Sequence, residues 1–165
     1  MSDMNVTDND IVQIGFVVED LEEAMDNYCE ILNVEEWYIY TFGSETGVEN
    51  FTYRGEEVDD FEYKIALGKA GDMQFELIEP VRNVPVFEKV LEEEGEGFHH
   101  IKQKVKTENI EEAVEEFADR GIEKLGGGTY KDDIFIYLKT KDPLGIIWEL
   151  GNAADIGEPE EIYFP

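Results

Sequence analysis

The stretch Glu94-Gly-Glu-Gly-Phe-His-His-Ile101 decides how the fold of this chain is interpreted. It contains the only two histidines, and a strand-like run from Phe98 to Val105 overlaps its end. A histidine pair at the start of a strand says little when it stands alone. The pair becomes informative because one pattern of predicted elements occurs twice in the chain, and His100 lies at the start of the second copy.

The first copy begins with an apolar, β-branched run, Ile11-Val-Gln-Ile-Gly-Phe-Val-Val18, which predicts a buried strand. Asp20-Leu-Glu-Glu23 has the form of a capping box and predicts an amphipathic helix that ends near Asn33. Three further strands are predicted at residues 37–42, 61–67 and 73–78. Residues 43–60 are predicted to form a long polar excursion, of the kind that is either a functional lid or disordered.

A short helix is predicted at residues 85–94, and then the pattern starts again. The second copy has a strand at 98–105, a helix opened by a second capping box, Asn109-Ile-Glu-Glu112, and strands at 122–125, 134–138 and 146–150. Gly126-Gly-Gly128 is interpreted as an ordinary turn between two of these strands. The predicted organisation is a first βαβββ module at 11–80, a linker helix at 81–97, a second module at 98–151, and tails at 1–10 and 152–165.

The two copies can be aligned on their sequences. Leu21-Glu-Glu-Ala24 matches Ile110-Glu-Glu-Ala113, and Phe75-Glu-Leu77 matches Trp148-Glu-Leu150. The same alignment equates two pairs of polar residues: Gln13 with His100, and Glu76 with Glu149. Four side chains able to bind a metal therefore occupy two pairs of equivalent positions.

These four residues offer an amide oxygen, two carboxylates and an imidazole, a set that suits a divalent first-row metal or magnesium. Such an ion acts as a Lewis acid on substrate oxygens and acidifies a neighbouring C–H group, so a carboxylate can carry the proton. The alternative is that Glu76 and Glu149 are solvated and that Gln13 and His100 are satisfied core residues. Glutamates inside otherwise apolar strands need a partner when buried, which favours the metal.

Composition limits the other functions. The chain has 165 residues and a formal charge of -28, from 41 acidic and 13 basic side chains, which disfavours binding to nucleic acid or anionic lipid. It contains no apolar run long enough to span a bilayer and no sequence that directs export. A single cysteine, Cys29, fits a reducing compartment, so we expect a cytoplasmic protein with a small-molecule substrate. The aromatic C-terminus, Ile162-Tyr-Phe-Pro165, is expected to dock on the fold.

The chain resembles the vicinal oxygen chelate superfamily, which includes glyoxalase I, methylmalonyl-CoA epimerase, extradiol dioxygenases and bleomycin-resistance proteins. The resemblance covers residues 11–150. The motifs that carry it lie at residues 12–24, Phe75-Glu-Leu-Ile-Glu-Pro80, 94–101 and Asp142-Pro-Leu-Gly-Ile-Ile-Trp-Glu-Leu150. It implies an α+β fold in which two βαβββ modules form a cup-shaped mixed sheet with helices outside.

In that superfamily the metal ligands come from the first and last strands of each module, which are the positions of Gln13, Glu76, His100 and Glu149. The implied ion is zinc, cobalt, nickel, manganese or magnesium. His99, next to the ligand position, is expected on the opposite face of the sheet. Homodimers are common in the superfamily, so a homodimer is also implied.

The linker and the Gly-Phe-His-His100 motif are most similar to methylmalonyl-CoA epimerase. This implies an isomerase or epimerase that removes a proton next to a metal-bound carbonyl or thioester oxygen. Epimerases usually carry histidine where this chain has Gln13, and the full ligand set is instead similar to that of zinc-type glyoxalase I (lactoylglutathione lyase). A non-catalytic, antibiotic-binding protein of the same fold is a further alternative. Glu149 is the first candidate base, and Glu62 lies near the position of a second epimerase base, although a solvent-facing strand residue is an equal interpretation.

Overall fold

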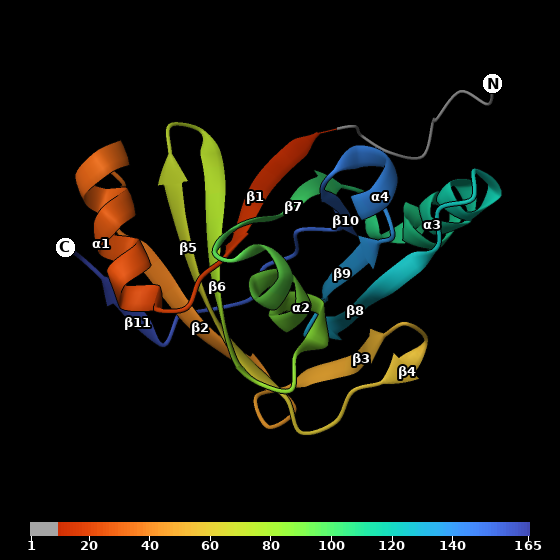
Figure 1. Cartoon of the computed structure of the whole chain (residues 1–165), viewed down its shortest axis with the longest axis horizontal. Helices are drawn as coiled ribbons and strands as arrows, with labels where there is room; N and C mark the ends of the chain where they lie inside the picture. Colours follow the sequence, from red (N-terminus) through yellow and green to blue (C-terminus); the bar gives the residue numbers. More distant parts are fainter. Residues whose placement is uncertain (1–9) are drawn as a thin grey trace.

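The computed structural model describes residues 10–165, so the predicted tail at 1–10 lies almost wholly outside the described residues. Its centre is one mixed sheet in the order β11-β2-β5-β6-β1-β7-β10-β9-β8-β3-β4 (Figure 1). The strands are β1 (Ile11–Val17), β2 (Trp37–Gly43), β3 (Val48–Tyr53), β4 (Glu56–Glu57), β5 (Glu62–Ala70), β6 (Met73–Arg82), β7 (Gly97–Lys104), β8 (Lys124–Tyr130), β9 (Asp133–Leu138), β10 (Ile147–Gly151) and β11 (Glu161–Tyr163). The helices are α1 (Leu21–Leu32), α2 (Pro85–Glu94), α3 (Ile110–Asp119) and α4 (Lys141–Leu144).

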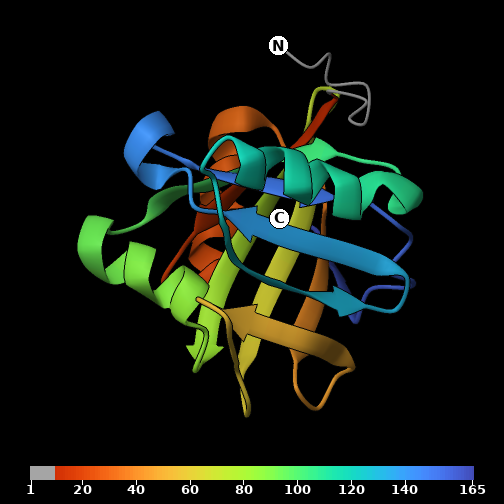
Figure 2. The same cartoon turned by 90° about the vertical axis from the view of Figure 1, so that its right-hand side faces the viewer.

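The sheet is built from two halves joined at its centre, where β1 pairs with β7 in antiparallel orientation. On one side of this pair β6 runs parallel to β1, followed by β5 and β2. On the other side β10 runs parallel to β7, followed by β9 and β8. The halves curve toward each other with α1 and α3 on the outside (Figures 1 and 2). The predicted α+β fold with a cup-shaped mixed sheet is confirmed.

Helix α1 begins where the sequence predicts. The side chain of Asp20 accepts a hydrogen bond of 2.9 Å from the backbone N–H of Glu23, and Asn33 ends the helix in the left-handed conformation (φ 55°). The second predicted box is not formed, because a 3₁₀ turn at Thr107–Asn109 leads into α3 and the side chain of Asn109 makes no cap.

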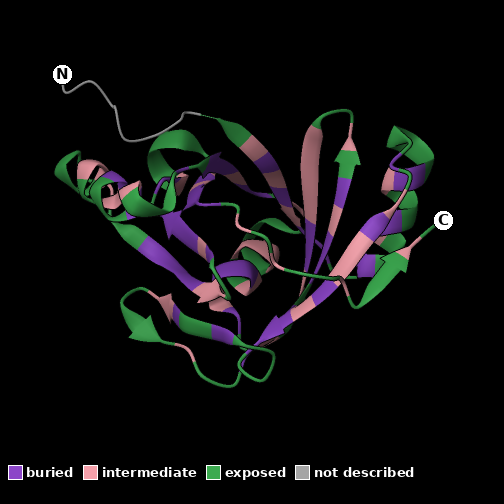
Figure 3. Ribbon diagram, turned by 180° about the vertical axis from the view of Figure 1, so that it is seen from behind, coloured by how far each residue is buried: buried purple, intermediate pink, exposed green. Residues whose placement is uncertain are grey.

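The sheet separates the hydrophobic core into clusters on its two faces. Figure 3 shows that buried positions alternate with less buried ones along the strands. On the outer face, α1 packs on the first half around Met25, Trp37 and Leu77. On the second half, α3 packs around Ile110 and Leu150. The inner faces share a third cluster with α2, rich in aromatic rings. The inner surface of the sheet is therefore covered largely by aromatic and aliphatic side chains.

The prediction of a loop at residues 43–60 is wrong. The segment forms the hairpin of β3 and β4, and β3 pairs with β8 of the other half. Phe51 explains this, because it is buried and stacks on Phe61 with ring centroids 4.3 Å apart. The polar composition of the segment concealed one apolar face, and the hairpin covers an edge of the sheet that would otherwise be open.

The interpretation of Gly126-Gly-Gly128 as a turn is also wrong, because β8 runs straight through it. The backbones on both sides come too close for side chains. A Cβ at Gly126 would lie 2.4 Å from the carbonyl oxygen of Thr52 in β3, and one at Gly127 would lie 2.2 Å from that of Phe135 in β9. These glycines allow close backbone approach between neighbouring strands.

The C-terminal segment docks on the fold. After β10 it crosses from the second half to the first (dark blue in Figure 1), and β11 pairs with β2. The Tyr163 hydroxyl donates a hydrogen bond to the carboxylate of Asp26 on α1. Within residues 10–165 no helix combines the length and apolar character that crossing a membrane requires.

Candidate functional site

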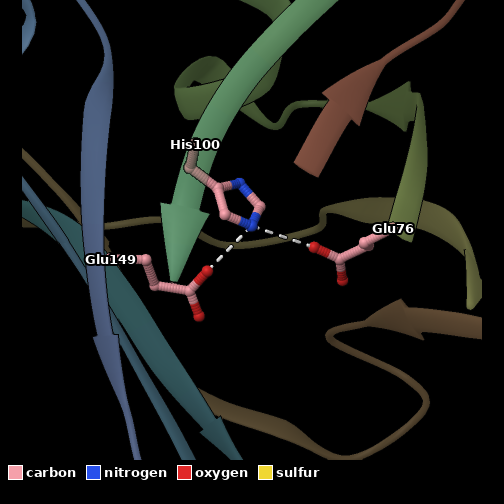
Figure 4. Close-up of side chains that lie close together, drawn as sticks. All are labelled: Glu76, His100 and Glu149. Carbon is pink, nitrogen blue, oxygen red and sulfur yellow. Dashed lines mark ion pairs between the residues drawn. The ribbon is translucent and has the colours of Figure 1, made fainter. Parts of the chain in front are cut away.

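The two halves direct polar side chains to one point on the inner face of the sheet. In β6, Phe75 and Leu77 pack beneath α1, so the strand alternation turns Glu76 inward. In β10, Trp148 and Leu150 pack beneath α3, so Glu149 turns inward. The same inner face receives His100 from β7 and Gln13 from β1. Figure 4 shows His100 between the two glutamates.

The side chains of Gln13, Glu76 and Glu149 lie within contact distance of the His100 imidazole. Its Nε2 is 2.9 Å from Oε2 of Glu149, 3.2 Å from Oε2 of Glu76 and 3.2 Å from Oε1 of Gln13. The ligand atoms of Glu76, His100 and Glu149 all lie within 4.8 Å of one another. Glu149 and His100 are buried and the side chain of Glu76 is 13% exposed.

His99 does not lie on the opposite face, contrary to the prediction. The pairing of β1 with β7 shifts between Gly15↔His100 and Phe16↔Phe98, so His99 is an extra residue in a bulge. The bulge interrupts the strand alternation and brings the two imidazoles together, with ring centroids 5.2 Å apart. Both histidines are fully buried.

The bulge creates a chain of hydrogen bonds that fixes which nitrogen of each imidazole carries a proton. The carbonyl oxygen of Val86 can only accept, so Nε2 of His99 donates to it at 2.7 Å. Burial and the neighbouring His100 lower the pKa of His99 to about 3, so His99 is neutral and its Nδ1 accepts from Nδ1 of His100 at 2.9 Å. In neutral His100 the remaining nitrogen, Nε2, then holds a lone pair.

That lone pair faces only acceptor oxygens, those of Gln13, Glu76 and Glu149. The arrangement therefore needs a cation at Nε2. Without a metal this is a proton: burial opposes it, but the carboxylates of Glu149 and Glu76 outweigh burial and raise the pKa of His100 to about 9. In addition, the buried Oε2 of Glu149 has no hydrogen-bond partner among the described residues when His100 Nε2 carries no proton. These observations fit the residues to a divalent cation.

Lys102 belongs to the site, although sequence reasoning did not identify it. It lies two positions after His100 on the same strand, which was the available signal. Its side chain is 9% exposed and its Nζ is 3.3 Å from Oε1 of Glu149. Burial opposes the charge of Glu149, but Lys102 and His100 outweigh it and lower the pKa of Glu149 to about 2. Glu149 is therefore ionised at neutral pH.

The cluster lies in a cavity of about 1030 Å³. Aromatic and aliphatic side chains of β2, β5 and β9 form its walls: Tyr38, Tyr40, Phe42, Tyr63, Ile65, Leu67, Phe135 and Tyr137. Asp133 also faces the cavity, and burial raises the pKa of its carboxyl group to about 6. The cavity thus combines apolar walls with many polar and charged side chains, and it is large enough for a small-molecule ligand.

The structure does not bring Glu62 to the cluster. In β5 the side chains of Tyr63, Ile65, Leu67 and Lys69 line the cavity, so Glu62 falls on the alternate face. Its carboxylate lies 3.8 Å from the guanidinium of Arg82.

Comparison with known proteins agrees with the fold. The family model of the Glyoxalase/Bleomycin resistance protein/Dioxygenase superfamily matches residues 12–137. The chain belongs to this superfamily. The resemblance described from the sequence is thus confirmed at the level of the superfamily, whereas no curated protein matches the sequence.

Solved structures of superfamily members share the architecture. Methylmalonyl-CoA epimerase from Mycobacterium tuberculosis is 18% identical with a TM-score of 0.65, covering 94% of both chains. A methylmalonyl-CoA epimerase in complex with methylmalonyl-CoA and NH4+ is 24% identical with a TM-score of 0.63, covering 94% of this chain and 100% of the other. A Streptomyces coelicolor epimerase in complex with 2-nitronate-propionyl-CoA is 25% identical with a TM-score of 0.62, covering 91% and 100%.

Proposed function

We propose that this protein is a metal-dependent isomerase or epimerase that removes and returns a proton on a carbon next to a carbonyl or thioester oxygen. The observation that carries the proposal is the lone pair of His100 Nε2, which faces three acceptor side chains at the inner end of a large cavity. Structural similarity to epimerases of the superfamily supports the same reaction class.

Gln13, Glu76, His100 and Glu149 would hold the ion. The carboxylates supply two negative charges that balance a divalent cation, and His99 holds the imidazole in the tautomer that offers Nε2. When bound, the ion supplies Lewis-acid chemistry, which lowers the pKa of a C–H group beside a polarised oxygen.

Glu149 is the proposed proton carrier. Its carboxylate is buried and ionised, it faces the cavity, and Oε2 has an unused lone pair. Lys102 holds the other oxygen, Oε1, so the position of the carboxylate is fixed while Oε2 stays available. The proposal gives no role to Glu62, because it lies outside the cavity beside Arg82.

A glyoxalase I-like reaction is the second candidate, and one observation favours it. The oxygen that Gln13 directs at the cluster gives the Gln–Glu–His–Glu set of zinc-type glyoxalase I. Both reactions move a proton at carbon, so they need the same arrangement of carboxylates. The complete cluster weighs against a purely binding role, for which no such set of ligands is required.

Two measurements test the proposal. Protein purified without chelator should contain about one equivalent of a divalent metal by elemental analysis, as expected for one set of ligands. The loaded protein should then incorporate solvent deuterium into a methylmalonyl thioester or isomerise the glutathione hemithioacetal. Less than half an equivalent of metal after reconstitution would support the binding protein instead, and exchange in neither substrate would contradict the proposed reaction.

A further inference from the structure

The cavity that leads to the cluster contains few cationic groups. Of the side chains that line it, only Lys69 and Lys102 are basic, and Lys102 lies deep in the site against Glu149. Recognition of phosphate usually depends on several arginine or lysine donors. The cavity of this protein offers one exposed lysine, Lys69, for that purpose.

Three acidic side chains line the same cavity and are exposed, so they lie where it opens to solvent, here called the mouth. Glu35 follows α1, Asp72 lies in the turn between β5 and β6, and Asp155 lies in the segment after β10; all three are exposed. They line the same cavity as Glu149.

The C-terminal segment lines part of the same cavity. Residues 153–157 line the cavity between the two halves of the sheet. The Ala154 N–H donates to Asp133 at 3.1 Å and Lys131 Nζ donates to the Ile156 carbonyl at 3.0 Å, which ties the segment to the second half. The Tyr40 hydroxyl donates to the Gly157 carbonyl at 3.0 Å, which ties it to the first half. Asp155 is thereby held at the mouth of the cavity.

From these contacts we infer that the substrate of the proposed reaction is a phosphate-free carbonyl or thioester compound, neutral or cationic at the end that lies between Glu35, Asp72 and Asp155. The inference rests on the proposed function and names its substrate class. A coenzyme A ester would place several phosphates near these carboxylates, and like charges that close repel each other. The aromatic walls favour an apolar middle portion of the ligand instead.

The test compares two thioesters of one acyl group, methylmalonyl-CoA and methylmalonyl-pantetheine, of which only the first carries the 3′-phospho-ADP group at its far end. The rate of solvent deuterium incorporation by metal-loaded protein is measured at low salt for both. We expect the pantetheine ester to be preferred by about tenfold in kcat/KM, with the preference shrinking at high salt as the charges are screened.

Two double variants distinguish the effect of the acidic residues at the mouth from the effect of the net charge of the whole chain. Glu35→Lys combined with Asp72→Lys changes two exposed residues of the mouth, whereas Glu108→Lys combined with Glu111→Lys changes two exposed residues around the start of α3 by the same total charge. The first pair should raise the ratio of kcat/KM for the CoA ester to kcat/KM for the pantetheine ester about tenfold. The second pair should leave this ratio unchanged.

The outcomes distinguish the two proposals. Equal or faster exchange with the CoA ester in the unmodified protein overturns the substrate class and leaves the proposed reaction intact. An equal gain from both variant pairs also overturns it, because the effect would then belong to net charge and not to the mouth. Exchange with neither ester, in protein that binds the metal, contradicts the proposed reaction and this inference with it.

Discussion

Gly15 makes room for the imidazole of His100. The two residues are direct partners across β1 and β7, and a Cβ at residue 15 would lie 2.1 Å from Cε1 of the ring. The ring therefore lies over the bare backbone of the neighbouring strand, which lets Nε2 reach the oxygens of Gln13, Glu76 and Glu149. Gly15 of the first half thus leaves the space that the His100 ring of the second half occupies.

Gly15→Ala should displace the His100 ring, because the added Cβ would occupy the space of the ring. We expect a loss of roughly 1–3 kcal/mol in the free energy of unfolding and at least about a tenfold loss of metal affinity. Chemical denaturation and isothermal titration calorimetry with zinc measure the two effects. Gly55→Ala is the control, since its Cβ would meet no atom within 4 Å and its φ of 82° adds only backbone strain. Unchanged zinc affinity in Gly15→Ala would refute the packing argument.

Glu149→Gln should keep the fold and abolish turnover. The amide has nearly the same size, but it cannot take up a proton and it removes one negative charge from the cluster. General-base catalysis accounts for about 10²–10⁴-fold in rate, so at least that loss is expected. Circular dichroism checks the fold and deuterium incorporation checks the activity, with exposed Glu108→Gln as the control. Undiminished turnover in Glu149→Gln would remove its assigned role.

The two histidines should give the metal-free protein a stability maximum near pH 6.5. The pKa of His99 is lowered to about 3, so below pH 6.5 the unfolded chain binds a proton that the folded chain does not. The free energy of unfolding therefore decreases as the pH is lowered from 6.5. His100 has its pKa raised to about 9, so its contribution is complete below pH 6.5 and is lost as the pH rises through 9. Each group can contribute a slope of at most about 1.4 kcal/mol per pH unit.

Denaturation in the presence of a chelator measures these slopes between pH 4 and 10. His99→Gln should flatten the acid side and His100→Gln the alkaline side, each leaving the other side in place. If both variants keep the full bell-shaped profile, other groups control it and the hydrogen-bond chain between the two imidazoles is incorrect.

Glu62→Gln should leave turnover within about twofold of the unmodified protein. Glu62 lies on the alternate face of β5 from the cavity-lining residues, and its nearest charged partner is Arg82 at 3.8 Å. The pair is partly exposed, so its loss should change stability by less than about 1 kcal/mol. The assay is the same deuterium incorporation used for Glu149→Gln, which makes the two substitutions a matched pair. A loss of activity comparable to that of Glu149→Gln would restore Glu62 as a second base.

Sequence patterns were sufficient for features that depend on local periodicity. The apolar residues on both sides of Glu76 and Glu149 predict which face of the sheet each glutamate occupies. These apolar neighbours must pack against a helix, so the glutamates face the other way. Asp20 predicts the start of α1 because its cap is made by the next three residues. Where the expected local rule was overridden, the prediction failed. The bulge at His99 and the strand through Gly126-Gly-Gly128 both depend on how a distant strand pairs.

The amino-acid sequence by itself determined that two similar halves exist and that each carries two polar residues at equivalent positions, because repetition and strand period are properties of neighbouring residues. Only the tertiary structure decided that His99 turns toward His100, that Lys102 joins Glu149, and that the segment after β10 lines the cavity. The physical reason is that these contacts join strands that are far apart along the chain. Their geometry is set by strand register and by the space that glycine leaves, which no local pattern encodes.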